Sequence, residues 1–371
     1  GGTITSSGGN VTLSQSILPI DPNDQSIDLT IYALSSDSNV KGAISLQGMG
    51  DDSHCFRQIS LTGGSITLSQ NSSICASKGV SFSGDLYLGS NILTSGSLYF
   101  SGTMNITGNT TLQGSSGITI LSSITPASTG PNLELDAGSN PLTISSSSLG
   151  SPTNPFGALS IKSSSLVLGG DVYSSSFIKI DSPITISKDT KINSTGPDGI
   201  SLKGVLKASS GSPNLTLDAG SSPLSIVGLG SKDNPLGALS LIGSSLSVGG
   251  DVGTNGSISF TGPISLTANA TLKGSERITL GSLVSYSPGF SLTLMSSGPV
   301  SVVNLGTGDQ ALSSISVTGT DLAATGGLIS SGGISLTGSN ITLGSNITAG
   351  SCFCFGYRRY RKRRFKFFRR Y

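Results

Sequence analysis

Apolar and polar residues alternate along most of the chain in short packets that recur every six residues. Between residues 80 and 112 each packet reads apolar–polar–apolar and is followed by Gly, Ser, Thr or Asn. The apolar positions of this stretch are Val80, Phe82, Leu86, Leu88, Ile92, Leu98, Phe100, Met104, Ile106 and Leu112. A period of two is typical of a strand with one buried face, and small residues are typical of turns. The pattern therefore predicts short strands that point two side chains inward and one outward before a corner.

The same spacing returns in two later stretches, at Leu166, Val172, Ile178, Ile184 and Thr190, and at Leu246, Val252, Ile258, Ile264 and Ala270. Three packets suit one turn of a three-sided helix of strands, so we predict an all-β chain that forms a right-handed parallel β-helix (β-solenoid) with about 18–20 residues per coil. Tandem small sandwich domains are the alternative fold. They need turns every 8–12 residues or so and fixed aromatic anchors, whereas turns here come every six residues and Trp is absent.

A longer repeat is superimposed on the packets. Residues Pro131–Gly138 recur as Pro213–Gly220, and residues Asn154–Ser160 recur as Asn234–Ser240. The repeat divides residues 1–350 into units at about 29–128, 133–212, 215–290 and 292–350. The first unit is longer than the second by about one coil, and a solenoid tolerates such insertions because each coil contacts only its neighbours.

Charge separates the repeat region from the C-terminal segment. Residues 1–350 hold 12 Lys or Arg and 19 acidic residues, whereas residues 351–371 hold nine Lys or Arg and no acid. Regular apolar packets argue against disorder in the first part despite the small polar residues. No apolar run approaches the roughly 20 residues of a membrane helix. Because residue 1 is not Met, we expect a fragment or processed piece of a longer protein.

Residues 351–371 form a basic aromatic tail that we expect to be disordered and outside the solenoid. Interleaved Arg and aromatic residues could contact a nucleic acid or an anionic membrane, and a frameshift product is the favoured alternative. The basic residues that would make an anionic-surface contact are Arg358, Arg359, Arg361, Lys362, Arg363, Arg364, Lys366, Arg369 and Arg370. The tail begins with Cys352 and Cys354, whose spacing suits neither a strain-free disulfide nor a complete metal site.

Cys55 and Cys75 are separated by about one coil. They could therefore form a disulfide between adjacent coils or stack as free thiols, and the sequence leaves both open. The segment Asp51–Cys55 is the one concentration of reactive groups in the repeat region. A single His and a single Cys lack the remaining ligands of a zinc site, and the segment occupies the slot of Ser151–Pro155 in the next repeat. We therefore interpret it as a corner insertion.

Asp136 and Asp218 occupy equivalent repeat positions, as do Asp171 and Asp251. Repeated acids could bind Ca²⁺, but the spacing of these lacks the pattern of Ca²⁺-binding β-helix repeats, so turn capping is predicted. Asn-x-Ser/Thr triplets, among them those at Asn105, Asn109, Asn269, Asn340 and Asn346, would matter only in a eukaryotic secretory pathway. Catalytic β-helices need carboxylates that converge on one groove. The acids here are scattered, so we expect no catalytic, metal or cofactor site.

Three segments carry a family resemblance: Gly96–Gly102, Gly256–Gly262 and Asn214–Gly220. With the six-residue packets, they make residues 1–350 resemble the repeat region of filamentous-haemagglutinin-like adhesins and autotransporter passengers of bacteria. The resemblance implies a protein that is secreted or exposed at the outer-membrane surface through a secretion partner. Such a rod would attach to host-surface carbohydrate or protein, to other surfaces or to other bacteria by weak multivalent contacts, and no nucleic acid is expected for the repeat region. The alternatives are a carbohydrate-active β-helix enzyme and a purely structural matrix or surface-layer component.

Overall fold

The computed structural model describes residues 1–7, 9–21, 26–34, 41–51, 53–69, 72–128, 130–145, 148–287 and 289–357. Within these ranges the chain is all-β and contains no helix. Its parallel sheets stack as a β-solenoid of about 14 turns. The predicted fold class is therefore confirmed, while the right-handed sense stays a prediction that rests on the handedness of parallel crossovers.

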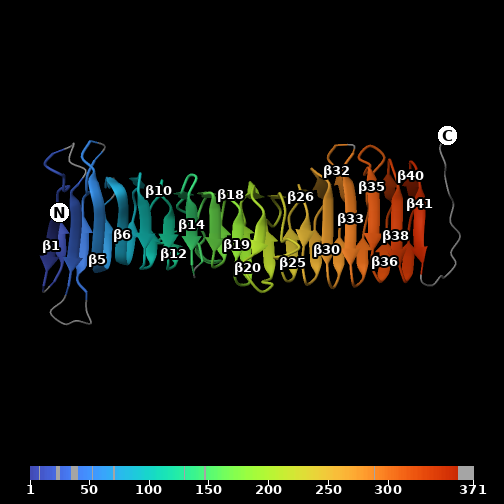
Figure 1. Cartoon of the computed structure of the whole chain (residues 1–371), viewed down its shortest axis with the longest axis horizontal. Helices are drawn as coiled ribbons and strands as arrows, with labels where there is room; N and C mark the ends of the chain where they lie inside the picture. The colour runs from blue at the N-terminus through green and yellow to red at the C-terminus, as the bar shows by residue number, and fades with distance from the viewer. Residues whose placement is uncertain are drawn as a thin grey trace. The chain divides into compact units, whose positions relative to one another are not determined.

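The chain divides into two compact units, Gly1–Thr185 and Ile186–Tyr371. The strands of the first unit, with β19 ending one residue beyond the division, are β1 (Gly2–Ser6), β2 (Val11–Leu13), β3 (Asp28–Ala33), β4 (Ala43–Leu46), β5 (Phe56–Leu68), β6 (Ala76–Leu88), β7 (Ile92–Thr94), β8 (Ser97–Phe100), β9 (Met104–Ile106), β10 (Thr110–Gly114), β11 (Ile118–Ile120), β12 (Ile124–Pro126), β13 (Leu133–Asp136), β14 (Pro141–Ile144), β15 (Leu159–Lys162), β16 (Ser165–Leu168), β17 (Val172–Ser174), β18 (Phe177–Asp181) and β19 (Ile184–Ile186). They pair in the orders β1-β3-β5-β6-β8-β11-β14-β16 and β7-β10-β13-β15-β18 (Figure 1).

The second unit is built in the same way. Its strands are β20 (Thr190–Ser194), β21 (Gly199–Leu202), β22 (Leu206–Ala208), β23 (Leu215–Asp218), β24 (Pro223–Ile226), β25 (Leu239–Ile242), β26 (Ser245–Val248), β27 (Val252–Gly253), β28 (Ile258–Thr261), β29 (Ile264–Leu266), β30 (Ala270–Gly274), β31 (Ile278–Leu280), β32 (Leu283–Ser285), β33 (Ser291–Ser296), β34 (Val300–Val302), β35 (Ser314–Thr318), β36 (Asp321–Ala324), β37 (Leu328–Ser330), β38 (Ile334–Gly338), β39 (Asn340–Leu343), β40 (Ile347–Ala349) and β41 (Phe353–Tyr357). They pair in the orders β20-β23-β25-β28-β31-β34-β36-β39, β21-β24-β26-β29-β32, β27-β30-β33-β35-β38-β41 and β37-β40.

One turn of the solenoid uses three successive packets, as the six-residue spacing predicts. Within the first unit, β6 pairs with both β8 and β9, and β7 pairs with β10. These registers place Val80 beside Leu98, Leu86 beside Met104 and Ile92 beside Leu112. All ten predicted inward positions between residues 80 and 112 are at most 2% exposed. The local alternation therefore identifies the core correctly.

The length of some turns departs from the prediction. Val80 pairs with Leu98 and Leu239 pairs with Ile258, which agrees with the expected coil of about 18–20 residues. Leu133, however, pairs with Leu159, so this turn is several residues longer than expected. The extra residues lie in wide corners such as Ser151–Pro155. A corner can lengthen because it lies outside the paired strands, so their hydrogen bonds and inward side chains keep their positions.

In each unit the core consists of stacked columns of Ile, Leu, Val and Phe side chains. Burying one such side chain fully stabilises the fold by about 1.5–3 kcal/mol. Phe82 and Phe100 lie on adjacent turns with parallel rings and centroids 5.2 Å apart. Each column repeats the same side-chain contact from turn to turn. The fold is therefore stabilised by contacts between neighbouring turns rather than by one central cluster.

The paired strands continue beyond residue 350, where we predicted that the solenoid ends. Strand β41 (Phe353–Tyr357) pairs in parallel with β38, and Phe353 lies beside Ile334. The abrupt change of composition at residue 351 suggested a tail, but alternation continues through Cys352–Phe355. The backbone can therefore add one more strand, because parallel pairing depends on backbone groups rather than on residue type.

Candidate functional sites

Residues 51 and 53–55 lie in a corner between strands. Asp51 and His54 exchange backbone hydrogen bonds (3.1 and 3.3 Å), as do Ser151 and Asn154 (3.0 and 3.2 Å). The Asp51 carboxylate accepts from the backbone N–H of His54 (2.8 Å), and the hydroxyl of Ser151 accepts from Asn154 in the same way (3.0 Å). The corner interpretation is therefore confirmed, with an acid in place of a serine as the capping group.

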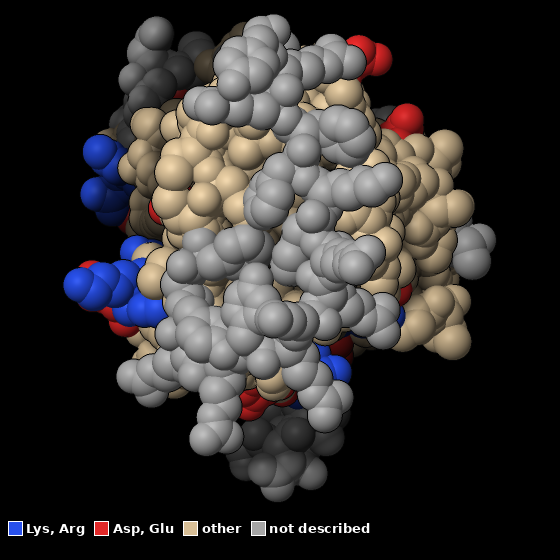
Figure 2. Space-filling view, turned by 90° about the vertical axis from the view of Figure 1, so that its right-hand side faces the viewer, with Lys and Arg blue, Asp and Glu red and all other residues tan. Residues whose placement is uncertain are grey.

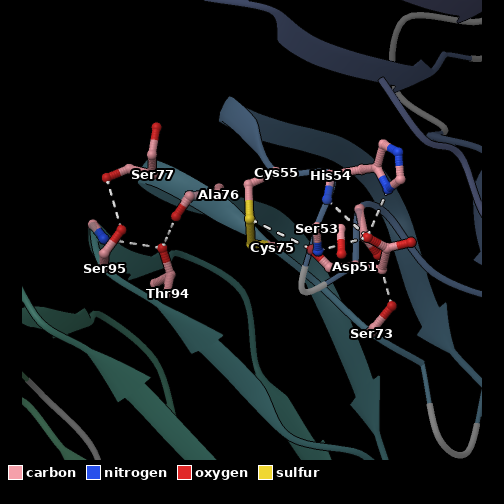
Figure 3. Close-up of a disulfide and its surroundings, with 12 residues drawn as sticks. Asp51, Ser53, His54, Cys55, Ser73, Cys75, Ala76, Ser77, Thr94 and Ser95 are labelled. Carbon is pink, nitrogen blue, oxygen red and sulfur yellow. Dashed lines mark hydrogen bonds and ion pairs between the residues drawn. A yellow bond between two sulfur atoms is a disulfide. The ribbon is translucent and has the colours of Figure 1, made fainter. Parts of the chain in front are cut away.

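The side chains of this corner add one polar contact. His54 Nδ1 lies 2.9 Å from Asp51 Oδ1, and both side chains are partly exposed (Figure 3). This hydrogen bond lowers the pKa of Asp51 below its ordinary value of 3.8, with further help from the backbone N–H groups of Ser53 and His54. Among the described residues, no group of three or more His, Cys, Asp or Glu could hold a metal ion. Asp52 lies outside the described residues.

Cys55 and Cys75 are joined by a disulfide that links this corner to the next turn (Figure 3). Their Cα atoms are 4.7 Å apart, within the range that a disulfide requires. Of the two arrangements left open by the sequence, the structure contains the bonded one. The bond stabilises mainly by restricting the unfolded chain between the two cysteines.

The repeated acids cap turns. Asp136 accepts from the backbone N–H of Gly138 (2.7 Å), and Asp218 accepts from that of Gly220 (3.0 Å). Both glycines have positive φ (59° and 56°), which a residue with a Cβ adopts at a cost. The prediction of turn capping is therefore confirmed for this pair of acids.

The second pair of acids also makes hydrogen bonds within the fold. Asp251 accepts from the backbone N–H of Thr271 on the next turn (2.8 Å), and Asp171 accepts from the hydroxyl of Tyr173 (3.1 Å). Partial burial, followed by the nearby charge of Asp171, raises the pKa of Tyr173. Each carboxylate thus serves a local contact within the fold.

Sequence reasoning missed a set of corner amides that connect neighbouring turns. Asn132 Oδ1 accepts from the backbone N–H of Ala158 (2.8 Å), and Asn214 Oδ1 accepts from that of Ala238 (2.7 Å). The same contact to a later turn is made by Asn10, Asn91, Asn109, Asn269 and Asn304. The recurrence of Asn132 as Asn214 in the long repeat was the available signal, but its acceptor role needs the neighbouring turn.

A second missed set consists of inward hydroxyls at the ends of strands. Thr94, Ser174, Thr254 and Ser330 are buried at nearly constant sequence spacing. The hydroxyl of Thr254 donates to the carbonyl of Gly256 (3.0 Å), and that of Ser330 donates to the carbonyl of Gly333 (3.4 Å). Each of these buried hydroxyls thus has a hydrogen-bond partner in the corner that follows its strand.

Outward positions of the strands form rows of hydroxyl side chains. In the second unit, parallel registers align three such rows: Thr216, Ser240, Ser259, Thr279 and Ser301; Ser201, Ser225, Ser247 and Ser265; and Thr271, Thr293, Ser316 and Ser335. A row of the first unit, interrupted by Tyr99, contains Thr3, Thr30, Ser60, Ser81, Tyr99, Thr119 and Thr143. Neighbouring members are about 4.8 Å apart, the spacing of paired strands. In the view of Figure 2, uncharged residues make up most of the described surface.

One pocket of the second unit lies among core side chains and offers no polar chemistry. Its lining consists of Val300, Val302, Leu305, Val317, Leu322, Ala323, Ala324, Leu328, Leu336 and Leu343. All of these are aliphatic, so the pocket contains no group that could act as an acid, a base or a nucleophile.

The tail contributes little to the described structure. The nine predicted basic contact residues, from Arg358 to Arg370, lie outside the described residues. Cys352 and Cys354 are described, and both are exposed. Their sulfur atoms are 2.9 Å apart, and the hydrogen bond with Cys352 raises the pKa of the Cys354 thiol.

Comparisons with protein-family models, with curated proteins and with solved structures find no match for this chain. Over the described residues, none of the elements is a helix of the length and apolarity needed to cross a membrane. A function is therefore proposed from the sheets, the corners and the outward hydroxyl rows of the chain.

Proposed function

We propose that this chain is the repeat region of a secreted or surface-exposed bacterial protein with a structural and adhesive function. It would resemble filamentous-haemagglutinin-like adhesins and autotransporter passengers, and an outer-membrane secretion partner would export it. Its ligand would be carbohydrate or protein at a host surface, another surface or another bacterium. On this proposal the chain has no active site of its own.

The outward hydroxyl rows are the observation that carries the proposal. Ser and Thr hydroxyls both donate and accept hydrogen bonds, so they suit ligands that are rich in hydroxyl and amide groups. A single exposed hydroxyl exchanges water for ligand with little net gain in free energy. Repetition at a constant spacing compensates, because a ligand held at one position meets the next position at high effective concentration.

The fold supports this use of the surface. Inward Leu, Ile and Val side chains form the core, so the outward side chains can vary without loss of packing. In the second unit the row Thr216–Ser301 continues over five paired strands without a charged member. A long polymer could contact several members of such a row at once, each of them weakly.

Binding of the purified chain to glycan arrays and to intact cells tests the proposal. We expect binding that rises steeply with ligand density, since avidity exceeds single-site affinity by about 10²–10⁴ when several contacts act together. Substitution of Ser240, Ser259 and Thr279 by Glu should weaken binding at least tenfold. The matched control changes Val205, Val227 and Val303 to Glu, which adds the same charge at exposed positions outside the hydroxyl rows.

Each alternative function predicts a different result. Release of sugar fragments from the array would indicate a carbohydrate-active enzyme. Binding to none of the surfaces would favour a structural matrix or surface-layer component and would overturn the adhesive proposal. Equal losses in the two triple variants would show that charge, and not the chosen row, controls binding.

A further inference from the structure

Cys352 and Cys354 form a pair of exposed thiols that no part of the proposed function uses. Their sulfur atoms lie 2.9 Å apart. Cys354 belongs to β41, where it lies beside Ser335 of β38, and the carbonyl of Cys352 accepts from the backbone N–H of Ile334 (3.0 Å). The backbone that carries the two thiols is therefore held in place by the preceding turn.

The alternation of a strand explains why the two sulfurs meet. Residues i and i+2 of a strand point to the same face, and their Cα atoms are about 6.6 Å apart. Cα separations in disulfides range from about 4.4 to 6.8 Å. Phe353, between the two cysteines, lies in register with buried Ile334. The thiols thus share the outward face and are close enough to bond, near the upper limit of the permitted range.

We propose that Cys352 and Cys354 are a redox-active dithiol that reacts with disulfides by thiol–disulfide exchange and closes into an intrastrand disulfide. In the first step, the thiolate of one cysteine attacks a disulfide R–S–S–R, forms a mixed disulfide and releases one R–SH after protonation. In the second step, the other cysteine loses its proton and attacks the protein sulfur of the mixed disulfide, which releases the second R–SH. The dithiol loses two electrons and two protons, and the external disulfide gains them.

The geometry makes the second step fast and the product labile. The second thiol lies in contact with the first, so its attack is intramolecular and benefits from a high effective concentration. The resulting bond would span a Cα separation near the limit, and strained, exposed disulfides are easily reduced again. A soft metal ion is a weaker candidate for this pair, because stable thiolate sites in proteins usually have three or four ligands.

The Cys55–Cys75 bond provides an internal contrast. It joins cysteines on neighbouring turns, at a sequence separation of 20, and is partly buried. A bond of this kind restricts the chain, whereas the exposed pair at residues 352 and 354 links positions that are already adjacent and would add little to stability. The two pairs thus suit different roles, one structural and one reactive.

Reaction of the full chain with 5,5′-dithiobis(2-nitrobenzoate), an aromatic disulfide, tests the proposal. The reagent is added after gentle reduction, with a Cys55→Ala, Cys75→Ala background run in parallel so that only the exposed pair is counted. We expect two equivalents of thionitrobenzoate per chain, no retained adduct, and a mass spectrum in which the peptide containing both cysteines has lost two hydrogen atoms. The variants Cys352→Ser and Cys354→Ser should each release one equivalent and retain one adduct.

A matched control keeps two thiols but moves one of them to another face. The double variant Ser351→Cys, Cys352→Ser places the thiols three residues apart, so we expect two retained adducts. The proposal is overturned if the natural chain itself retains two adducts or leaves its thiols unreacted. It is also overturned if the control variant closes its disulfide as fast as the natural pair, because alternation along the strand would then not position the sulfurs.

Discussion

The contact between Phe82 and Phe100 allows a direct test of the register between turns in the first unit. Phe82 lies on β6 and Phe100 on β8, each side chain is 1% exposed, and the ring centroids are 5.2 Å apart. The pairing requires that one complete turn of the solenoid lead from Phe82 to Phe100. A slip of one residue would place Phe82 beside Tyr99 or Ser101, whose side chains point outward.

Replacement of each Phe by Leu measures how much the contact between the two rings stabilises the fold. Truncation of a buried Phe to Ala costs about 3–5 kcal/mol, so the milder change to Leu should cost about 1–2 kcal/mol at each site. An aromatic pair contributes about 0.5–1.5 kcal/mol beyond the area that it buries. The double variant Phe82→Leu, Phe100→Leu should therefore be more stable than the sum of the single effects predicts, by about 1 kcal/mol.

Urea denaturation followed by far-ultraviolet circular dichroism measures the four proteins of this cycle. Because turns of a solenoid can unfold separately, hydrogen exchange of the peptides that contain residues 80–100 should be measured on the same samples. Phe156 serves as the matched control, since it is fully buried and lies beside Ser174 rather than beside an aromatic ring. The cycle between Phe82 and Phe156 should give additivity within about 0.5 kcal/mol. A coupling for Phe82 and Phe100 no larger than this control would refute the register.

Three further predictions concern the corners. Replacing Cys55 and Cys75 by Ser should lower the free energy of unfolding by about 3 kcal/mol, the chain-entropy value for a loop that closes over a sequence separation of 20, as measured by urea denaturation. The change Asn214→Ala should lower the free energy of unfolding by about 1 kcal/mol. It should also speed hydrogen exchange of the Ala238 amide, which donates to Asn214 from the next turn. The pKa of Asp51 is lowered, so its carboxylate stabilises the corner fully at pH values above the ordinary pKa of 3.8. This stabilisation is lost as the pH falls through the lowered pKa. Protection of the His54 amide should therefore stay constant down to about pH 4 and decline below it.

Controls for these corner predictions follow from the same contacts. Reduction of the natural disulfide should reproduce the effect of the Ser variants, and a stable protein under both treatments would contradict the prediction. Asn214→Asp keeps the acceptor oxygen for Ala238 but sets a second carboxylate beside Asp189, which accepts from the Asn214 amide (2.9 Å). We therefore expect protection of the Ala238 amide to return while the lost stability does not. His54→Ala should move the acid transition of the corner toward the ordinary carboxyl range, and an unchanged transition would show that the hydrogen bond to His54 does not lower the pKa of Asp51.

The candidate sites were predictable in part. The equivalence of Asp51–Cys55 with Ser151–Pro155 was visible in the long repeat, and the two corners share their hydrogen bonds. The roles of Asn132 and Asn214 were not predictable, because the backbone N–H that donates to each of them belongs to the following turn. The pairing of Cys55 with Cys75 likewise needed the distance between turns, since a spacing of about one coil fits bonded and free thiols alike.

The sequence by itself determines which side chains face inward and where corners occur. Alternation along a strand is a local property, and a polar residue at an inward position such as Leu98 would lose the free energy of burial in any register. Only the tertiary structure decides how far apart in the chain the paired strands lie, because that separation depends on hydrogen bonds between distant segments and on the length of the corners. The long turn from Leu133 to Leu159 and the strand at Phe353–Tyr357 both follow from such pairing. The period of the hydrophobic pattern does not give the length of that turn, and the alternation at Cys352–Phe355 does not by itself give the partner of that strand.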